Sequence, residues 1–244
     1  LATLRKAFNR HDNKPTLIAV EGEAGSGKTA LITESILHAI ETPCHLLAGK
    51  SDAYNKKPHN ALSQALAKSV GILLALPDDQ FISWRLMLLE ALNYNPHTLI
   101  SLCPELIVVF ETADFSEKTT LYNADIQLKL HTSIYLQHLS ELAPVLLFID
   151  DVQWCDGASV ALFETLIKAK HSRITIIMTC RSDEVGANHP YSLMKKTVAD
   201  NGANSVVIRL ANLDVEQVTQ LLVATFHIEK DRLQELAKIL LKKT

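Results

Sequence analysis

The sequence contains little that would direct the protein to a zinc ion, a membrane or a nucleic acid. Its four cysteines are widely spaced and form no C-x-x-C pair, which argues against zinc and thioredoxin-like sites. No apolar run approaches the roughly 20 residues that a bilayer-spanning helix needs, and no signal peptide is visible. The formal net charge of −3 gives no bulk attraction to nucleic acid. We therefore expect a cytoplasmic protein with reduced thiols, no membrane partner and no direct contact with nucleic acid.

The length and composition are those of an ordinary globular protein. The 244 residues include 48% hydrophobic and 21% charged side chains, enough to bury a sizeable core. They can form one large domain or two small ones. The sequence begins at Leu1 rather than at a methionine, which fits a piece of a longer protein.

The most informative motif is the segment GEAGSGKT, from Gly22 to Thr29, which matches the phosphate-loop pattern G-x-x-x-x-G-K-[ST]. It follows an apolar run at 16–20 and opens a helical pattern at 30–40. Glycines let the backbone wrap closely around phosphates, and the loop N–H groups and the helix N-terminus face the anion. A glycine-rich turn before a helix is the alternative. The predicted phosphate ligands are Gly22, Gly25, Ser26, Gly27, Lys28, Thr29 and Ala30, with Lys28 reaching the β- and γ-phosphates.

A second motif is the acidic pair Asp150-Asp151, which ends the apolar run at 144–149. Such a run is typical of a strand that is covered on both faces of a parallel sheet. In phosphate-loop ATPases and GTPases, an acid at this place holds Mg²⁺. We therefore predict Thr29 and Asp150 as magnesium ligands, and Asp151 as the acid that orients or deprotonates the attacking water. The alternative is a helix-capping pair of acids in a loop.

Strands and helices alternate through much of the remaining chain. Apolar runs predict buried strands at 43–48, 173–180 and 205–210, and helical periodicity appears at 61–76 and 124–142. This alternation predicts an α/β fold with a parallel sheet and right-handed crossovers. Ligands bind at the carboxyl ends of the strands in such sheets. Arg181 is therefore expected to face the γ-phosphate, unless it is a solvated arginine in a strand-exit loop.

Several segments together resemble one family. Residues 150–159, DDVQWCDGAS, resemble the "DD-hydrophobic-QW-x-D-x-x-S" motif of signal-transduction ATPases of the STAND class, which are related to AAA+ proteins. The segments 50–65, 180–190 and 210–222 resemble further elements of the same group. The resemblance implies a three-layer α/β/α P-loop fold, magnesium binding by Asp150, a catalytic role for Asp151 and a sensor role for Arg181. It is closest to the ATPase modules of large bacterial signalling proteins, such as sensor histidine kinases, serine/threonine kinases and transcriptional regulators.

The domain organisation follows from the same comparison. We expect a P-loop ATPase core over 1–211, with a helical insertion at about 77–120, and the start of a helical lid over 212–244. In the lid, Asp214 is expected to cap a helix together with Gln217, and Val215, Val218, Leu222 and Phe226 form its apolar stripe. The family's adenine-binding Gly-Arg element and its glycine-rich lid element are not in the sequence. The lid is therefore expected to be truncated and the adenine pocket incomplete.

The resemblance implies an ATP-binding, slowly hydrolysing regulatory module that acts as a nucleotide-dependent switch with ATP or ADP and Mg²⁺. Its implied partners are output and sensor domains of the same parent protein, with a homo-oligomer on activation. Two alternatives stay open. A scaffold with little hydrolysis is favoured by the lack of an assignable arginine finger. A DNA-handling AAA+ ATPase would need a winged helix or a basic face, and neither is visible.

We predict that Lys28→Ala weakens ATP binding by roughly 1.5–3 kcal/mol, the contribution of a hydrogen bond to a charged group. The fold should persist, because the change removes a charge beside the phosphates. Isothermal titration calorimetry of the two proteins measures the difference. An unchanged affinity would show that this loop is not the nucleotide site.

Overall fold

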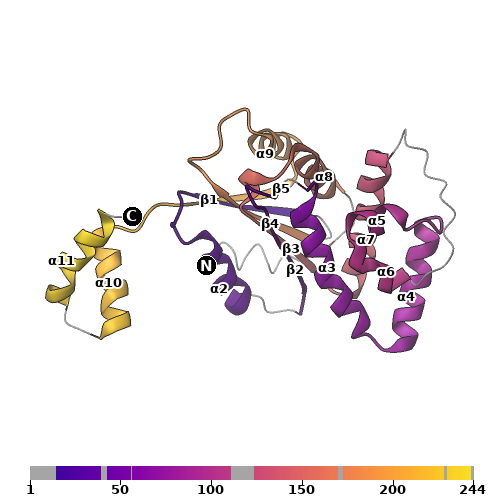
Figure 1. Cartoon of the computed structure of the whole chain (residues 1–244), viewed down its shortest axis with the longest axis horizontal. Coiled ribbons are helices and arrows are strands. Elements are labelled where there is room, and N and C mark those ends of the chain that lie inside the picture. The colour runs from indigo at the N-terminus through magenta and orange to yellow at the C-terminus, as the bar shows by residue number, and fades with distance from the viewer. Residues whose placement is uncertain are drawn as a thin grey trace.

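The computed structural model describes residues 15–39, 43–55, 57–110, 124–169, 173–227 and 230–242. At its centre is a five-stranded sheet in the order β2-β3-β4-β1-β5, with every pairing parallel (Figure 1). The strands are β1 (Thr16–Gly22), β2 (His45–Lys50), β3 (Val145–Asp150), β4 (Ile174–Arg181) and β5 (Asn204–Leu210). The predicted α/β fold with a parallel sheet is confirmed.

The central strands are buried along their whole length. All seven residues of β1 and all six of β3 are buried, because both faces of a parallel sheet are covered and its strands are nearly continuous apolar runs. The register sets Gly22 beside both Arg181 and Leu210, and Lys50 beside Asp150. The carboxyl ends of the strands therefore meet at one edge of the sheet.

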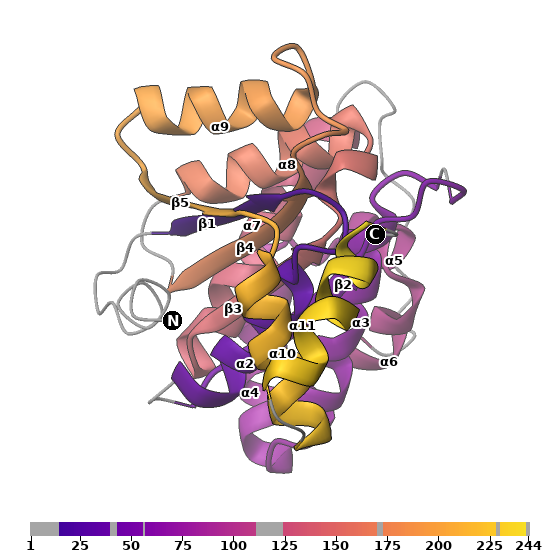
Figure 2. The same cartoon turned by 90° about the vertical axis from the view of Figure 1, so that its left-hand side faces the viewer.

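Helices cover both faces of the sheet and make three layers. On one face, Ile32 of α2 (Lys28–Ala39) packs on Ile18, Val20 and Ile177. The other face, which includes Leu17 and Ala19, is covered by α3 (Asn60–Leu74), α7 (Ala124–Leu142), α8 (Gly157–Lys168) and α9 (Pro190–Asp200). Helices α8 and α9 lie side by side (Figure 2). The predicted α/β/α layering is confirmed.

The region predicted as a helical insertion contains four short or medium helices where it is described. They are α4 (Asp78–Ala91), α5 (His97–Leu102), the 3-10 helix η1 (Pro104–Leu106) and α6 (Ile107–Phe110). Trp84 fixes α4 to α7, because its ring meets that of Tyr135 edge-on at 6.0 Å and its Nε1 donates to the His138 carbonyl at 3.1 Å. Residues 111–120 of the predicted insertion lie outside the described residues, as do residues 1–14 of the predicted core.

The C-terminal part is a helical hairpin of α10 (Val215–Phe226) and α11 (Lys230–Leu241), which Figure 1 shows at the end of the molecule away from the sheet. The predicted cap is confirmed, because Asp214 Oδ1 accepts from Gln217 N at 2.8 Å and Gln217 Oε1 accepts from Asp214 N at 3.0 Å. The predicted stripe is wrong at Phe226, whose side chain is 56% exposed. The boundary at 211/212 and the truncation of a lid stay predictions. None of the helices in the described ranges is long and apolar enough to span a bilayer.

Strand β2 and helix α3 approach so closely that only glycine fits at position 49. A Cβ on Gly49 would lie 1.8 Å from the carbonyl oxygen of Ala61. This close approach fixes the end of β2 against the start of α3.

We expect Gly49→Ala to lower the free energy of unfolding by about 1–3 kcal/mol, because the added methyl group overpacks this contact. Gly71→Ala is the matched control. Gly71 lies inside α3 with nothing within 4 Å of a new Cβ, so that change should raise stability by up to about 1 kcal/mol. Urea denaturation of both variants measures the difference, and equal effects would contradict the packing argument.

Candidate functional site

The loop between β1 and α2 has a backbone path that requires glycine at three positions. Gly25 and Gly27 have φ of +76° and +84°, a region that side-chain-bearing residues rarely adopt. At Gly22, a Cβ would lie 2.6 Å from Ser26 Oγ and 2.7 Å from the Leu210 carbonyl oxygen. The glycine pattern in the sequence therefore corresponds to a real steric constraint.

The polar groups of this loop fit a phosphate. Lys28, which is 7% exposed, donates to the carbonyl oxygens of Gly22 at 2.9 Å and Glu23 at 2.7 Å. Ser26 Oγ is buried and has no hydrogen-bond partner among the described residues. A phosphate oxygen would supply that partner, and buried polar groups without one are rare in native proteins. Lys28, Thr29 and Ala30 form the first turn of α2, where N–H groups face an anion.

Thr29 and Asp150 meet at the start of α2. The Thr29 hydroxyl donates to Asp150 Oδ1 at 3.0 Å, and the Thr179 hydroxyl donates to the same oxygen at 2.5 Å. A hydroxyl and a carboxylate are oxygen ligands of the kind that Mg²⁺ prefers. In the described part of the chain, no group of three His, Cys, Asp or Glu side chains could hold a metal ion.

Asp151 follows β3 in a left-handed conformation, with φ 56° and ψ 48°. Its backbone N–H donates to Thr179 Oγ1 at 2.9 Å, and its Oδ1 accepts from Gln153 Nε2 at 3.0 Å. Lys50 Nζ lies 3.1 Å from its Oδ2, and Arg181 Nε lies 3.5 Å from its Oδ1. Burial raises the pKa of Asp151, but the Gln153 hydrogen bond and the two cations outweigh burial and hold the pKa below its ordinary value. Asp151 is therefore an ionised carboxylate at neutral pH.

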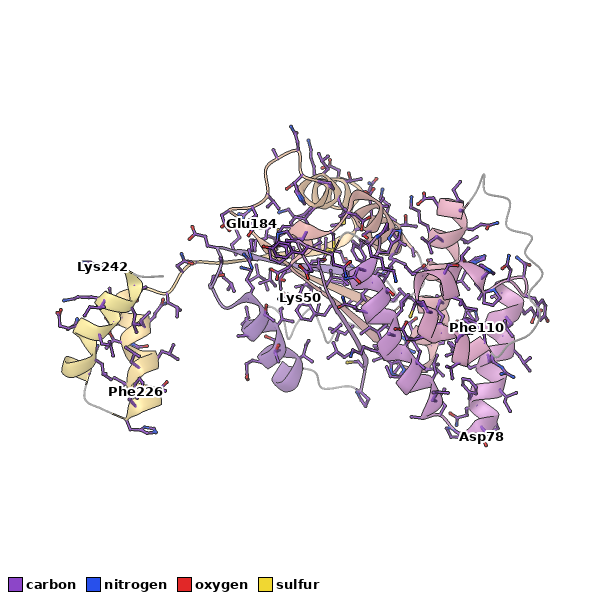
Figure 3. All side chains as sticks on the ribbon, viewed as in Figure 1. Lys50, Asp78, Phe110, Glu184, Phe226 and Lys242 are labelled. Atoms are coloured by element: carbon purple, nitrogen blue, oxygen red, sulfur yellow. The ribbon has the colours of Figure 1, made fainter. Side chains whose placement is uncertain are left out.

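Lys50 is a site residue that our sequence-based site prediction missed. Its Nζ bridges the two acids, at 3.1 Å from Asp151 Oδ2 and 3.4 Å from Asp150 Oδ2. Chiefly through the hydrogen bond to Asp151, the pKa of Lys50 is raised. Figure 3 shows Lys50 in the central part of the molecule, together with Glu184. We predicted a strand at 43–48, two residues too short at its end, and so placed Lys50 in a loop. The Gly-Lys pair after an apolar run was the available signal.

Arg181 lies at the acidic pair within a small network. Its Nη1 lies 2.9 Å from Glu184 Oε1, and its guanidinium carbon lies 4.7 Å from the centre of the Trp154 ring. Trp154 Nε1 donates to Glu184 Oε2 at 2.8 Å. The structure thus brings Arg181 within 3.5 Å of Asp151. Its role as a sensor of the γ-phosphate stays a prediction.

A buried carboxylate lies in β1, one residue before the loop. Glu21, 8% exposed, accepts from the Tyr191 hydroxyl at 3.0 Å, and Lys195 Nζ reaches the same oxygen. Arg209 Nε lies 3.6 Å from its other oxygen. These contacts tie the end of β1 to α9 and β5. Glu21 was not among our predicted residues, although a charged residue in an apolar run before the loop was visible in the sequence.

The family of the chain follows from a comparison with known protein families. A family model described as an AAA ATPase domain matches residues 1–178. The chain belongs to this family. An AAA ATPase domain implies the binding of a nucleotide, which agrees with the phosphate-fitting loop.

Similar proteins include a curated signalling protein and two solved structures. The hybrid signal transduction histidine kinase G of Dictyostelium discoideum is 26% identical over 156 residues, which cover 62% of the chain and 4% of that protein. One solved structure is a signal transduction ATPase with numerous domains (STAND) from Pyrococcus horikoshii, which has a tetratricopeptide repeat sensor. It is 12% identical in sequence, and the match covers 97% of the present chain and 27% of the Pyrococcus chain, with a TM-score of 0.45. The other is the Drosophila ORC bound to DNA, which is 13% identical in sequence. That match covers 93% of the present chain and 45% of the Drosophila chain, with a TM-score of 0.44. The chain thus spans a small part of the signalling protein that it matches.

We predict that Thr179→Val lowers the free energy of unfolding by about 1–3 kcal/mol, because it leaves the buried Asp151 N–H without an acceptor. Thr179→Ser keeps the hydroxyl and should stay within about 1 kcal/mol of the parent protein, having lost only a methyl group. Chemical denaturation of the three proteins tests this. Equal losses in both variants would mean that the hydroxyl contributes nothing.

Proposed function

We propose that this chain is an ATP-binding and slowly hydrolysing regulatory module of the STAND class in a multidomain signal-transduction protein. The observation that carries the proposal is the contact between Thr29 and Asp150. These residues are 121 positions apart in the sequence, yet their oxygens are 3.0 Å apart. One ends the predicted phosphate loop and the other ends β3, so their contact supports a nucleotide–metal site formed by both.

The residues around that contact have distinct roles in this proposal. The loop N–H groups and Lys28 bind the β- and γ-phosphates of ATP, and Thr29 and Asp150 hold Mg²⁺. Bound Mg²⁺ neutralises charge that develops on the phosphates during transfer. Thr179 positions Asp150 through its hydroxyl. Gly22, Gly25 and Gly27 keep the loop open to the phosphates.

Asp151 orients the attacking water and accepts its proton. Lys50, Arg181 and Gln153 all contact this carboxylate, so it is held in place but is a weak base. A base is most effective when its pKa lies near the working pH. The lowered pKa of Asp151 therefore supports slow hydrolysis, the behaviour of a switch rather than of a metabolic enzyme.

The signalling context rests on the named relatives and on the resemblance in the sequence. A histidine kinase of signal transduction matches over 62% of the chain, which supports output and sensor domains of the same parent protein as partners. In this proposal the hairpin of α10 and α11 is the start of a lid over the nucleotide, and activation brings copies together in the cytoplasm.

A nucleotide-dependent scaffold with little hydrolysis is the second candidate. It is favoured by the three polar contacts that occupy Asp151, because a carboxylate so engaged has little capacity to take a proton. The two candidates share the nucleotide site and differ only in turnover.

A phosphate-release assay separates the two candidates. We expect Asp151→Asn to lower kcat by about 100-fold or more, the usual contribution of a general base, with ATP affinity retained. Asp183→Asn is the matched control, because Asp183 is an exposed acid two residues after Arg181. Equal rates in all three proteins would remove Asp151 from catalysis. If the intact parent protein releases no phosphate, the first candidate is wrong and the scaffold function remains.

A further inference from the structure

A pocket of about 620 Å³ lies between α5, α7 and the segment that leads into α3. Its volume is within the range of small-molecule sites, roughly 300–1,000 Å³. The described residues that line it include none from the phosphate loop or the acidic pair. It lies where the helices that follow α3 meet the ATPase core, and such junctions often hold ligands.

The wall of the pocket combines apolar surface with fixed hydrogen-bonding groups. Pro58, Leu102 and Leu128 supply apolar surface. The Thr98 hydroxyl is 2.6 Å from His131 Nδ1, and the Ser101 hydroxyl is 3.3 Å from His97 Nδ1. Where the imidazole Nδ1 carries the proton and donates it, the hydroxyl keeps its own proton for a polar group of a ligand, while the apolar wall covers the rest of the ligand.

A positive charge lies on the described lining of the pocket, and the carboxylates of Asp125 and Asp156 act on His59 from outside that lining. Lys57 is the one formally charged side chain among its described lining residues. His59 also lines it, and burial lowers the pKa of this imidazole and of the neighbouring His131, so both rings are neutral at neutral pH. A molecule with one negative group and an apolar body complements this lining.

His59 connects the pocket to the acidic pair. Its backbone is left-handed, with φ 58°, which is uncommon for a residue other than glycine. Its N–H donates to Asp156 Oδ2 and Ser159 Oγ, both at 3.1 Å. Asp156 caps α8 and lies two residues after Trp154, whose ring stacks on Arg181 beside Asp151. His59 is therefore connected, through Asp156 and the segment that carries Trp154, to Arg181 beside Asp151.

We propose that this pocket binds a small organic carboxylate with an apolar body, and that its occupant modulates the ATPase site. The binding stands on the pocket alone, whereas the modulation rests on the proposed function.

Binding is tested with benzoate as the probe and benzamide as its neutral analogue, by saturation-transfer NMR and thermal shift. We expect benzoate to bind and benzamide to bind less tightly. Lys57→Met should weaken the affinity for benzoate by about threefold, since an exposed ion pair contributes modestly to binding. The same change should leave the affinity for benzamide unchanged. No binding of benzoate, or no preference over benzamide, would overturn the proposal.

The position of binding is tested by filling the pocket. Leu128→Trp should abolish the benzoate signal, whereas Leu130→Trp should not, because Leu130 lies on the same helix and is 54% exposed. Ser101→Trp fills the pocket from an exposed position and serves if the first variant fails to fold. Lys28→Ala should bind benzoate normally. If the Lys28→Ala variant no longer binds benzoate, the probe occupies the nucleotide site and the proposal is wrong.

Modulation is measured as a change in ATP affinity. We expect saturating benzoate to change the Kd for ATP by about fivefold or more in the parent protein, a typical coupling between sites, and not in the Leu128→Trp variant. Benzoate that binds without changing ATP affinity would overturn the modulating role. A protein that binds benzoate but not ATP would overturn the proposed function and leave the pocket intact.

Discussion

The structure depends on placing two adjacent carboxylates at the end of a buried strand. Asp150 and Asp151 are only 6% and 7% exposed, and such a pair is unfavourable without counter-charges and donors. The sheet supplies them because β3 lies between β2 and β4. Strand β2 contributes Lys50, and β4 contributes Thr179 and Arg181. The strand order thus supplies the partners that offset the cost of burying the acidic pair. Without strands β2 and β4 on either side of β3, the two buried carboxylates would lack these partners.

Much of this arrangement was predictable because its signals are local. The glycines of the phosphate loop follow from a backbone path that excludes side chains, and the pattern names them directly. The apolar runs of β1 and β3 follow from burial on both faces. The cap at Asp214 needs only a partner three residues away. Each of these features is decided within a few positions of the chain.

The rest depends on register between distant segments, which one sequence does not reveal. Lys50 becomes a site residue only because its position in β2 pairs with Asp150. The Thr179 hydroxyl and the Glu21 carboxylate find partners 28 to 188 positions away. Phe226 fits the apolar stripe of its helix but is exposed, because α10 packs on α11 through Val215, Val218 and Leu222 instead. A periodic pattern shows that a face exists and not how far its partner extends.

The contact of Arg209 with Glu21 has a consequence for solubility. In the described sheet, β5 pairs with β1 alone, and a strand with a free side offers its backbone groups to other chains. Val207 on this strand is 43% exposed, and Arg209, at 81%, places a charge beside it. Charged side chains on such strands oppose aggregation. An apolar substitution at Arg209 would remove this protection and the Glu21 contact together, so precipitation of that variant would not by itself indicate a misfolded phosphate loop.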